Sequence, residues 1–452
     1  MRRRFTPLAG LVLLPVLLAL PLRAQEPAAV KHESYTLPNG LRVILSEDHS
    51  AQVVAVDVWY DVGSRNERPG RTGFAHLFEH MMFQGSANVK KAEHFQFVER
   101  AGGSMNGSTT EDRTNYFEAV PSNRLNLALW LEADRMRSLS VTDSNFSNQR
   151  EAVKEERRLR VDNQPYTKAI FEDQYALYDS ATCFPYSHSV IGSMDDLNAG
   201  RTADVQQFFK EYYAPNNATL VIAGDFDPAE AKRLIEQYFG EIPRAERPAP
   251  LPCNAKFNTG QVRRVVPDAK ATLPAAVHVY RVPEYSNADT PALELLATIL
   301  GQGESSRLNR QLAREAKSAV AAQTLMNPFG PRRGPGVFLA LAIANQGINI
   351  DSLDRQLASE IARLSREGVT AAELSKAQNS YRASQINDRQ RALNVAEALH
   401  RATMFLGSPE AINTDLQRYL RVTPEDIKRV AAKYLRPDNS LILIITPKET
   451  QS

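Results

Sequence analysis

The sequence predicts an α+β fold of two tandem homologous α/β domains, each a half-barrel-like sheet with packed helices. A chain of 452 residues is too long for a single hydrophobic core. Its halves also match, since residues 73–85 align with 291–303 at an offset of 218 and residues 215–217 align with 437–439 at an offset of 222. Strand-like and helix-like runs follow one another without strict βαβ alternation, which favours antiparallel sheets.

The first 24 residues are typical of a secretory signal peptide. Arg2, Arg3 and Arg4 precede an apolar run over residues 8–22, and the small residue Ala24 precedes polar sequence. A membrane anchor fits less well, because the run is about 15 residues long and contains two prolines. We therefore expect cleavage after Ala24, a periplasmic location and no membrane anchor in the mature form.

Charge and cysteine content exclude some classes of function. The net charge of +2 includes four arginines of the signal peptide, so the mature chain is close to −2 (2 − 4) and shows no sign of nucleic-acid binding. Cys183 and Cys253 could form a disulfide in an oxidising compartment or remain two buried thiols. Their spacing does not match a metal site.

Hydrophobic periodicity predicts the main elements of both domains. Strands are expected at Val53–Tyr60, Asn115–Val120, Ala218–Ala223 and Ser440–Ile445, and a helix at Arg124–Leu139. Proline-rich sequence with little periodicity marks a linker between the halves. The expected limits are 31–242 for the metal-binding catalytic domain, 243–260 for the linker and 261–448 for the second domain.

The stretch His76-Leu77-Phe78-Glu79-His80 carries the strongest chemical signal. On a helix, His76 and His80 lie one turn apart on the same face and can hold one zinc ion. Glu79 lies beside them and can take a proton from a zinc-bound water as general base. The surrounding residues are apolar, so these polar side chains need a partner such as a metal ion.

A third ligand is expected from the charged helix around residues 149–159. On a helical wheel Glu156 falls within its narrow apolar stripe, whereas Glu155 falls at the edge or outside. An acid on a buried face needs a compensating cation, so Glu156 is the predicted ligand and Glu155 the alternative. One zinc ion per chain is expected.

The second half lacks these ligands. The positions of His76, Glu79 and His80 are occupied by Glu294, Ala297 and Thr298. The sequence therefore predicts a metal site in the first domain only.

The chain resembles the pitrilysin/insulinase-type zinc peptidases, in the branch that contains the mitochondrial processing peptidases. That family carries H-x-x-E-H and a glutamate ligand some seventy residues later; here Glu156 follows His80 by 76 positions. Residues 35–43, 102–109 and 212–225 resemble further family segments. The resemblance covers the mature chain and implies the same duplicated fold.

The resemblance also implies how a peptide substrate is held. Residues 102–110 match the substrate-edge segment, where Asn106 would hydrogen-bond the peptide backbone. The alternative is an ordinary surface loop capped by Asn and Ser.

Three positions depart from the family pattern. Gln149 stands where many members have a glutamate, which changes the charge beside the metal. Ala313 and Val320 stand where single-chain members carry an arginine and a tyrosine that bind substrate and stabilise the oxyanion. The resemblance therefore implies a homologous partner subunit that supplies the Arg/Tyr pair, in a heterodimer, with a homodimer as the alternative.

Together these features predict a zinc endopeptidase that acts on unfolded peptides or small proteins. One alternative is a non-catalytic zinc-binding scaffold subunit of a processing or respiratory-type complex. Another is a zinc enzyme that hydrolyses an ester or amide in a small molecule.

Overall fold

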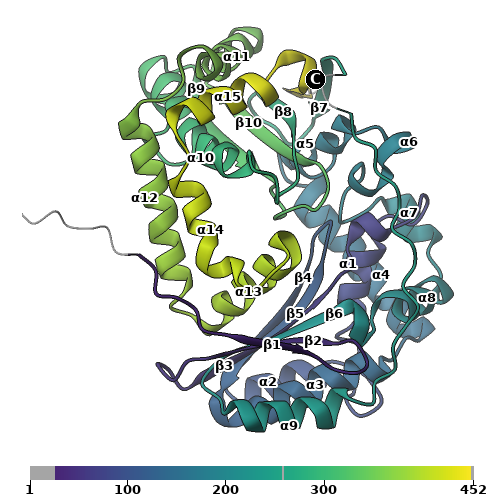
Figure 1. Cartoon of the computed structure of the whole chain (residues 1–452). Coiled ribbons are helices and arrows are strands. Elements are labelled where there is room, and N and C mark those ends of the chain that lie inside the picture. The colour runs from purple at the N-terminus through teal and green to yellow at the C-terminus, as the bar shows by residue number, and fades with distance from the viewer. Residues whose placement is uncertain (1–25, 257–258, 449–452) are drawn as a thin grey trace, which may run out of the picture.

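The computed structural model describes residues 26–256 and 259–448, so the predicted signal peptide lies outside the described residues. Within these ranges no helix is both long enough and apolar enough to cross a membrane. Two sheets dominate the structure, one in each half of the chain (Figure 1).

The first sheet has six strands in the order β1-β2-β6-β3-β5-β4. Their bounds are β1 Glu33–Thr36, β2 Arg42–Glu47, β3 Val53–Tyr60, β4 Ser104–Thr109, β5 Thr114–Pro121 and β6 Ala218–Gly224. The pairings are antiparallel except β2 with β6, which run parallel. Four of the five strand pairs are thus antiparallel, as expected from sequence, and only β2 and β6, which a long stretch of chain separates, run parallel.

The second sheet repeats this arrangement without a counterpart of β1. Its order is β7-β11-β8-β10-β9, with the parallel pair between β7 and β11. The bounds are β7 Val262–Asp268, β8 Ala275–Val282, β9 Ala319–Met326, β10 Gly336–Ala344 and β11 Ser440–Pro447. The same order in both sheets confirms the α+β fold with a duplicated architecture.

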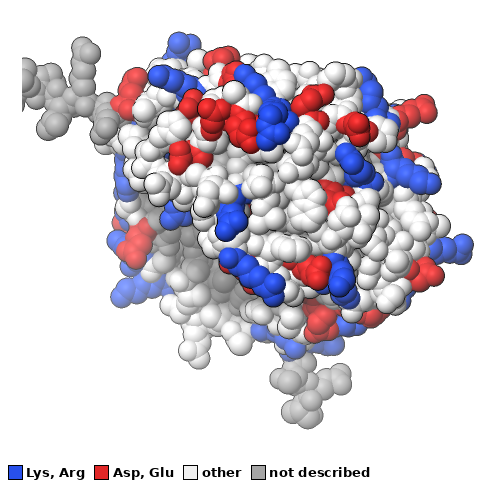
Figure 2. All heavy atoms as spheres, turned by 90° about the horizontal axis from the view of Figure 1, so that it is seen from below, with Lys and Arg blue, Asp and Glu red and all other residues white. Residues whose placement is uncertain are grey.

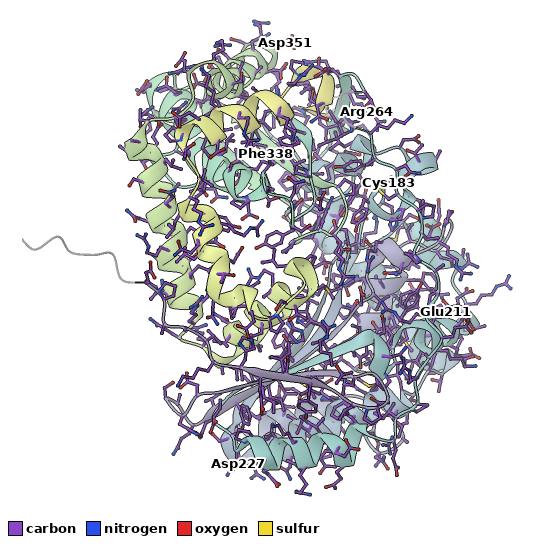
Figure 3. The ribbon with its side chains drawn as sticks, in the orientation of Figure 1. Cys183, Glu211, Asp227, Arg264, Phe338 and Asp351 are labelled. Carbon is purple, nitrogen blue, oxygen red and sulfur yellow. A yellow bond between two sulfur atoms is a disulfide. The ribbon has the colours of Figure 1, made fainter. Side chains whose placement is uncertain are left out.

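Helices pack against both sheets. In the first half they are α1 Phe74–Met81, α2 Glu93–Arg100, α3 Leu125–Ser138, α4 Asp143–Arg157, α5 Thr167–Phe171, α6 Ser180–Cys183, α7 Met194–Ala199, α8 Thr202–Tyr212 and α9 Pro228–Phe239. In the second half they are α10 Thr290–Gly301, α11 Ile350–Glu367, α12 Ala371–Asp388, α13 Ala392–Leu406, α14 Ala411–Leu420 and α15 Pro424–Tyr434. Figure 3 places the fully buried Phe338 inside the second half and the exposed Asp227 at the outer side of the first.

Each half covers one face of the other half's sheet. Helix α13 of the second half packs on β3 and β6 of the first, where Leu399 and Ala396 meet Val221 in a buried apolar cluster. In return, a first-half segment that includes Ala169 and Leu177 packs on β8, β10 and β11. Sequence periodicity did not predict this exchange, because it depends on contacts between distant segments.

Buried ion pairs also join the halves. Arg332 forms an ion pair with Glu111 at the β4–β5 turn, and neither side chain is exposed to solvent. The next residue, Arg333, donates its backbone N–H to Asp112 Oδ2 at 3.1 Å and pairs with Asp61 through its side chain at 2.8 Å. The second-half loop 327–334 is therefore fixed to the end of β4.

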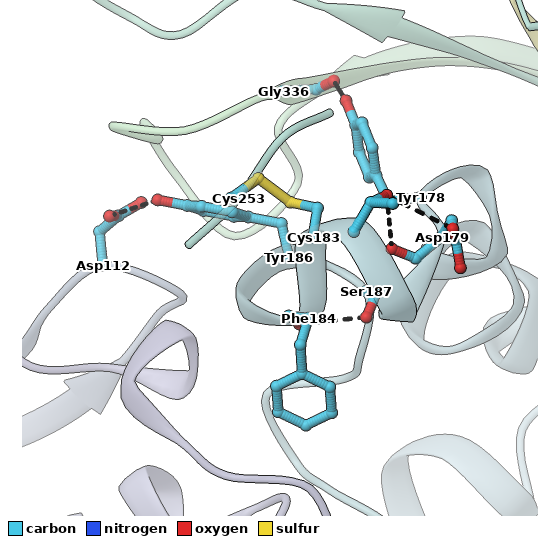
Figure 4. Close-up of a disulfide and its surroundings, with 10 residues drawn as sticks. Asp112, Tyr178, Asp179, Cys183, Phe184, Tyr186, Ser187, Cys253 and Gly336 are labelled. Carbon is cyan, nitrogen blue, oxygen red and sulfur yellow. Dashed lines mark hydrogen bonds between the residues drawn. A yellow bond between two sulfur atoms is a disulfide. The ribbon is translucent and has the colours of Figure 1, made fainter. Parts of the chain in front are cut away.

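Cys183 and Cys253 form a disulfide, which decides between the two alternatives left open by the sequence (Figure 4). The bond joins α6 to the segment that follows α9. Close by, Tyr186 donates a hydrogen bond to Asp112 at 2.8 Å. The disulfide thus fixes part of the linker against the first half.

The charged surface shows no grouping by sign on the face seen in Figure 2, where acidic and basic side chains lie interspersed. That face gives no positive surface on which a phosphate backbone would bind.

Candidate metal centre

Helix α1 is fixed in place at its first turn. The buried carboxylate of Glu67 accepts hydrogen bonds from the backbone N–H groups of Gly73 at 2.9 Å and Ala75 at 2.7 Å. Such a carboxylate satisfies unpaired donors at a helix N-terminus. Gly73 has φ +86°, and a Cβ there would lie 2.7 Å from the Ile191 carbonyl oxygen. The start of the helix therefore requires glycine and sets the rotation of the histidines that follow.

The structure brings His76, His80 and Glu156 together. Glu156 Oε2 lies 3.6 Å from His76 Nε2 and 3.2 Å from His80 Nε2. One ligand atom from each side chain lies within 4.8 Å of the others. Ligands at about 2.1 Å from a tetrahedral zinc ion are about 3.4 Å apart, so this spacing fits the metal.

The alternative ligand, Glu155, lies elsewhere. Its side chain is exposed and pairs with Arg158 at 2.9 Å. Glu156 is the acid that α4 presents to the histidines, while its other oxygen pairs with Arg160 at 3.0 Å.

The protonation states of His76 and Glu156 suit metal binding. Burial alone would lower the pKa of His80, but its contact with Glu156 and the charge of Glu79 raise it. Burial, with His80 nearby, lowers the pKa of His76 to about 4, so its imidazole is neutral at pH 7. Burial alone would raise the pKa of Glu156, but its contact with His80 and the nearby charges of His76 and Arg160 lower that pKa to about 2. A neutral imidazole and an ionised carboxylate are the forms that coordinate zinc.

Gln149 orients one of the histidines. Its Oε1 lies 3.3 Å from His80 Nδ1, so Nδ1–H donates to the amide and the Nε2 lone pair points toward Glu156 and His76. Outer partners of this kind fix the tautomer of a metal-binding histidine. The amide therefore keeps the hydrogen bond that a glutamate would accept but brings no charge.

Replacing Gln149 with leucine is expected to weaken zinc binding about 10- to 100-fold, because His80 loses the acceptor at Nδ1. A chelator competition assay measures the change. Gln149→Glu is the matched control, since it keeps an acceptor and should bind zinc at least as tightly as the parent. Equal affinity of the leucine variant and the parent would exclude an orienting role.

Glu79 is buried on α1 next to His80 and contacts strand β4. Its Oε2 accepts a hydrogen bond from Thr109 Oγ1 at 2.6 Å, and no described residue bonds Oε1. A Cβ on Gly107 would lie 3.2 Å from Glu79 Cγ, so glycine leaves room for the carboxylate. Burial raises the pKa of Glu79, which makes it a better proton acceptor than an exposed glutamate. The sequence pattern predicts this segment as the substrate edge but gives no role to Thr109 or Gly107. Alternate residues of a strand face the same side, so Gly107 and Thr109 share the face opposite to that of Asn106. This alternation is the signal that points to them.

Asn106 lies on β4, which is the last strand of its sheet. The side chain is exposed, and its Oδ1 accepts a hydrogen bond from the backbone N–H of Gly107 at 2.9 Å. The outer edge of β4 pairs with no described strand, so its backbone groups can receive an extended peptide.

No second metal centre is found at the matching place in the second half among residues 26–256 and 259–448. Glu294 instead accepts a hydrogen bond from Tyr419. Ala313 offers no polar side chain, and Val320 is 50% exposed on the edge strand β9.

A second cluster of possible ligands, His94, Glu118 and Glu132, is fully buried in the first half. The guanidinium of Arg135 pairs with Glu132 and lies 4.0 Å from Glu118, so the protein itself supplies the cation there. This cluster is a buried ion network.

Comparison with known proteins gives consistent matches along the chain. A family model described as Insulinase (Peptidase family M16) matches residues 42–180, and one described as Peptidase M16 inactive domain matches residues 202–381. The zinc protease PqqE of Helicobacter pylori is 32% identical over 422 residues, which cover 92% of this chain and 93% of that protein. A probable mitochondrial-processing peptidase subunit beta of Arabidopsis thaliana is 25% identical over 91% of this chain and 78% of its own length.

Solved structures show the same fold. The crystal structure of a protease from Helicobacter pylori has a TM-score of 0.87 at 30% identity, covering 93% of this chain and all of that one. The periplasmic protease PqqL from Escherichia coli has a TM-score of 0.74 at 18% identity; the match covers 94% of this chain but 48% of PqqL.

Proposed function

The chain belongs to the insulinase-type peptidase family M16, whose relatives include proteins named zinc proteases, and from this premise we propose that it is a zinc endopeptidase acting on unfolded peptides or small proteins. The observation that carries the proposal is the convergence of His76, His80 and Glu156 beside the buried Glu79. Zinc-dependent peptide hydrolysis uses such a set of three ligands with a general base beside it.

In this proposal His76, His80 and Glu156 hold one zinc ion. When bound, the ion supplies a Lewis acid that polarises the scissile carbonyl and acidifies water. Glu79 moves the proton: Oε1 accepts it from the attacking water and then donates it to the leaving amine. Thr109 holds Oε2 and so fixes the carboxylate for both transfers.

The substrate is held as an added strand along β4. Main-chain hydrogen bonds at a sheet edge bind an extended peptide whatever its sequence. Asn106, exposed on this strand, would hydrogen-bond the peptide backbone near the scissile bond. A folded protein has few free extended segments, so unfolded chains are the expected substrates.

A homologous partner subunit completes the proposed enzyme. Ala313 and Val320 leave the second half without the donors that steady the oxyanion in the single-chain enzymes that this chain resembles. The chain matches about half of PqqL, and a solved first half of PqqL matches it over 93% of that chain, which supports a two-part enzyme. A second copy of the same chain carries the same alanine and valine, so a heterodimer is favoured over a homodimer.

Adding a homologous chain that has the Arg/Tyr pair and lacks H-x-x-E-H should raise peptide hydrolysis about a hundred-fold, because one oxyanion donor contributes about that much. Digestion of a peptide library with and without the partner measures the change. Full activity of the pure single chain would contradict the need for a partner.

We place the protein in the periplasm. The signal-like N-terminus, the Cys183–Cys253 disulfide and the likeness to a protease titled periplasmic support this location.

A second candidate function is a non-catalytic zinc-binding scaffold, favoured by the missing donor pair and by the inactive-domain match over 202–381. Turnover by the zinc-loaded chain with its partner would exclude the scaffold.

A further inference from the structure

The side chains of β4 alternate between two different environments. Thr109 and Gly107 face Glu79, as their contacts with it show. Ser108 faces the opposite side, where its hydroxyl donates to Asn115 Oδ1 at 2.7 Å and Asn115 donates to Asp57 at 3.2 Å. Helix α13 covers this side of the sheet.

The side chains of a peptide added to β4 point alternately to the same two sides, because side chains directly opposite each other on paired strands share a face of the sheet. A peptide residue opposite Gly107 or Thr109 faces the metal centre. The neighbouring peptide residue, opposite Ser108, points toward α13.

A pocket of about 170 Å³ lies on that side. It is lined from the first half by Trp59, Thr110 and Arg113 and from the second half by residues 329–331, Glu397, Arg401 and Phe405. Arg113 joins the pocket to the strand, since its Nη1 donates to the Ser108 carbonyl and to Asn115 Oδ1, both at 2.8 Å. One lining residue of the pocket, Arg113, is therefore in direct contact with Ser108.

The pocket holds more positive than negative charge. Arg401 is partly buried yet makes no hydrogen bond or ion pair with any described residue. Of the three guanidinium nitrogens of Arg113, only Nη1 forms hydrogen bonds with described residues. The guanidinium carbon lies 4.9 Å from the centroid of the Trp59 ring. Glu397 is the one carboxylate in the lining, against the two arginines Arg113 and Arg401.

We propose that this pocket, the Arg113–Arg401 pocket, binds an acidic side chain of the peptide at the position next to the residue that faces Glu79. A carboxylate would give Arg401 the charge-assisted partner it lacks, and the pocket has room for one side chain. The proposal rests on the proposed function, since it assumes a peptide on β4.

Binding measurements test this without turnover. In the full-length Glu79→Gln variant, fluorescence anisotropy compares the binding of labelled peptides that differ only by Glu or Gln at one position. The same comparison is repeated with that position moved along the peptide. Glu should bind about ten-fold or more tightly than Gln at a single position, the ratio expected for one charge-assisted hydrogen bond. Arg401→Gln should bring the ratio close to one, while Arg391→Gln, an exposed arginine just before α13, should leave it unchanged.

Glu397→Gln provides a change of the opposite sign. It removes the competing carboxylate and should raise the preference for Glu, so the proposal stays testable if the Arg401 variant does not fold. Equal binding of Glu and Gln peptides at every position, an unchanged ratio in both variants, or no binding of either peptide would overturn the proposal. The proposed function is judged separately, by the digestion assay.

Discussion

Replacing Glu79 with glutamine is expected to abolish peptide hydrolysis while leaving the zinc content unchanged. The side chain keeps its size and its contact with Thr109, but it can no longer accept a proton from water. Loss of general base catalysis typically lowers the rate by about 10²- to 10⁴-fold. The measurement pairs metal analysis of the purified variant with its initial rate on a peptide substrate, in the presence of the partner.

Glu155→Gln is the matched control for this variant. That side chain is exposed and pairs with Arg158, so its loss should change neither zinc content nor rate. A Glu79→Gln enzyme that retains its rate would remove Glu79 from the proposed role, whereas loss of zinc would show that the side chain supports the metal site.

Arg332→Met is expected to destabilise the folded chain by about 3–5 kcal/mol. The change leaves the Glu111 carboxylate buried without its cation, and breaking a buried ion pair from one side costs about this much. Urea unfolding compared with the parent protein measures the difference. The double variant Glu111→Gln with Arg332→Met should recover part of the loss, because no unpaired charge remains buried.

The neighbouring Arg333→Met serves as a control. Its ion pair with Asp61 is partly exposed, so its loss should cost about 1 kcal/mol or less. Equal destabilisation by the two variants would show that burial does not set the strength of the Arg332–Glu111 pair.

The local part of the candidate site could be predicted from sequence. The i, i+4 spacing of His76 and His80 determines a shared helix face, and the position of Glu156 within an apolar stripe points it inward. Strand β3 and helix α3 were expected within a residue or two of their observed ends. The conclusions that these side chains bind zinc and that Asn106 contacts substrate remain predictions, as do the domain limits 31–242 and 261–448.

The contacts between distant segments could not be predicted. Neither the Arg332–Glu111 pair nor the position of Arg401 beside Arg113 follows from periodicity, because each joins residues more than 200 positions apart. The packing of α13 on the first sheet has the same origin. A single sequence shows which residues of a helix or strand are apolar, but it does not show which distant element those residues pack against.

The exchange of covering segments between the halves determines when a newly synthesised chain can finish folding. Until the ribosome has made α13, Ile44, Val221 and Ala223 on the first sheet lack most of the apolar side chains that cover them. A chain arrested before that point would expose this apolar surface to chaperones and quality-control proteases. The first half, which contains all of the predicted zinc ligands, therefore depends for its maturation on one of the last helices to be translated.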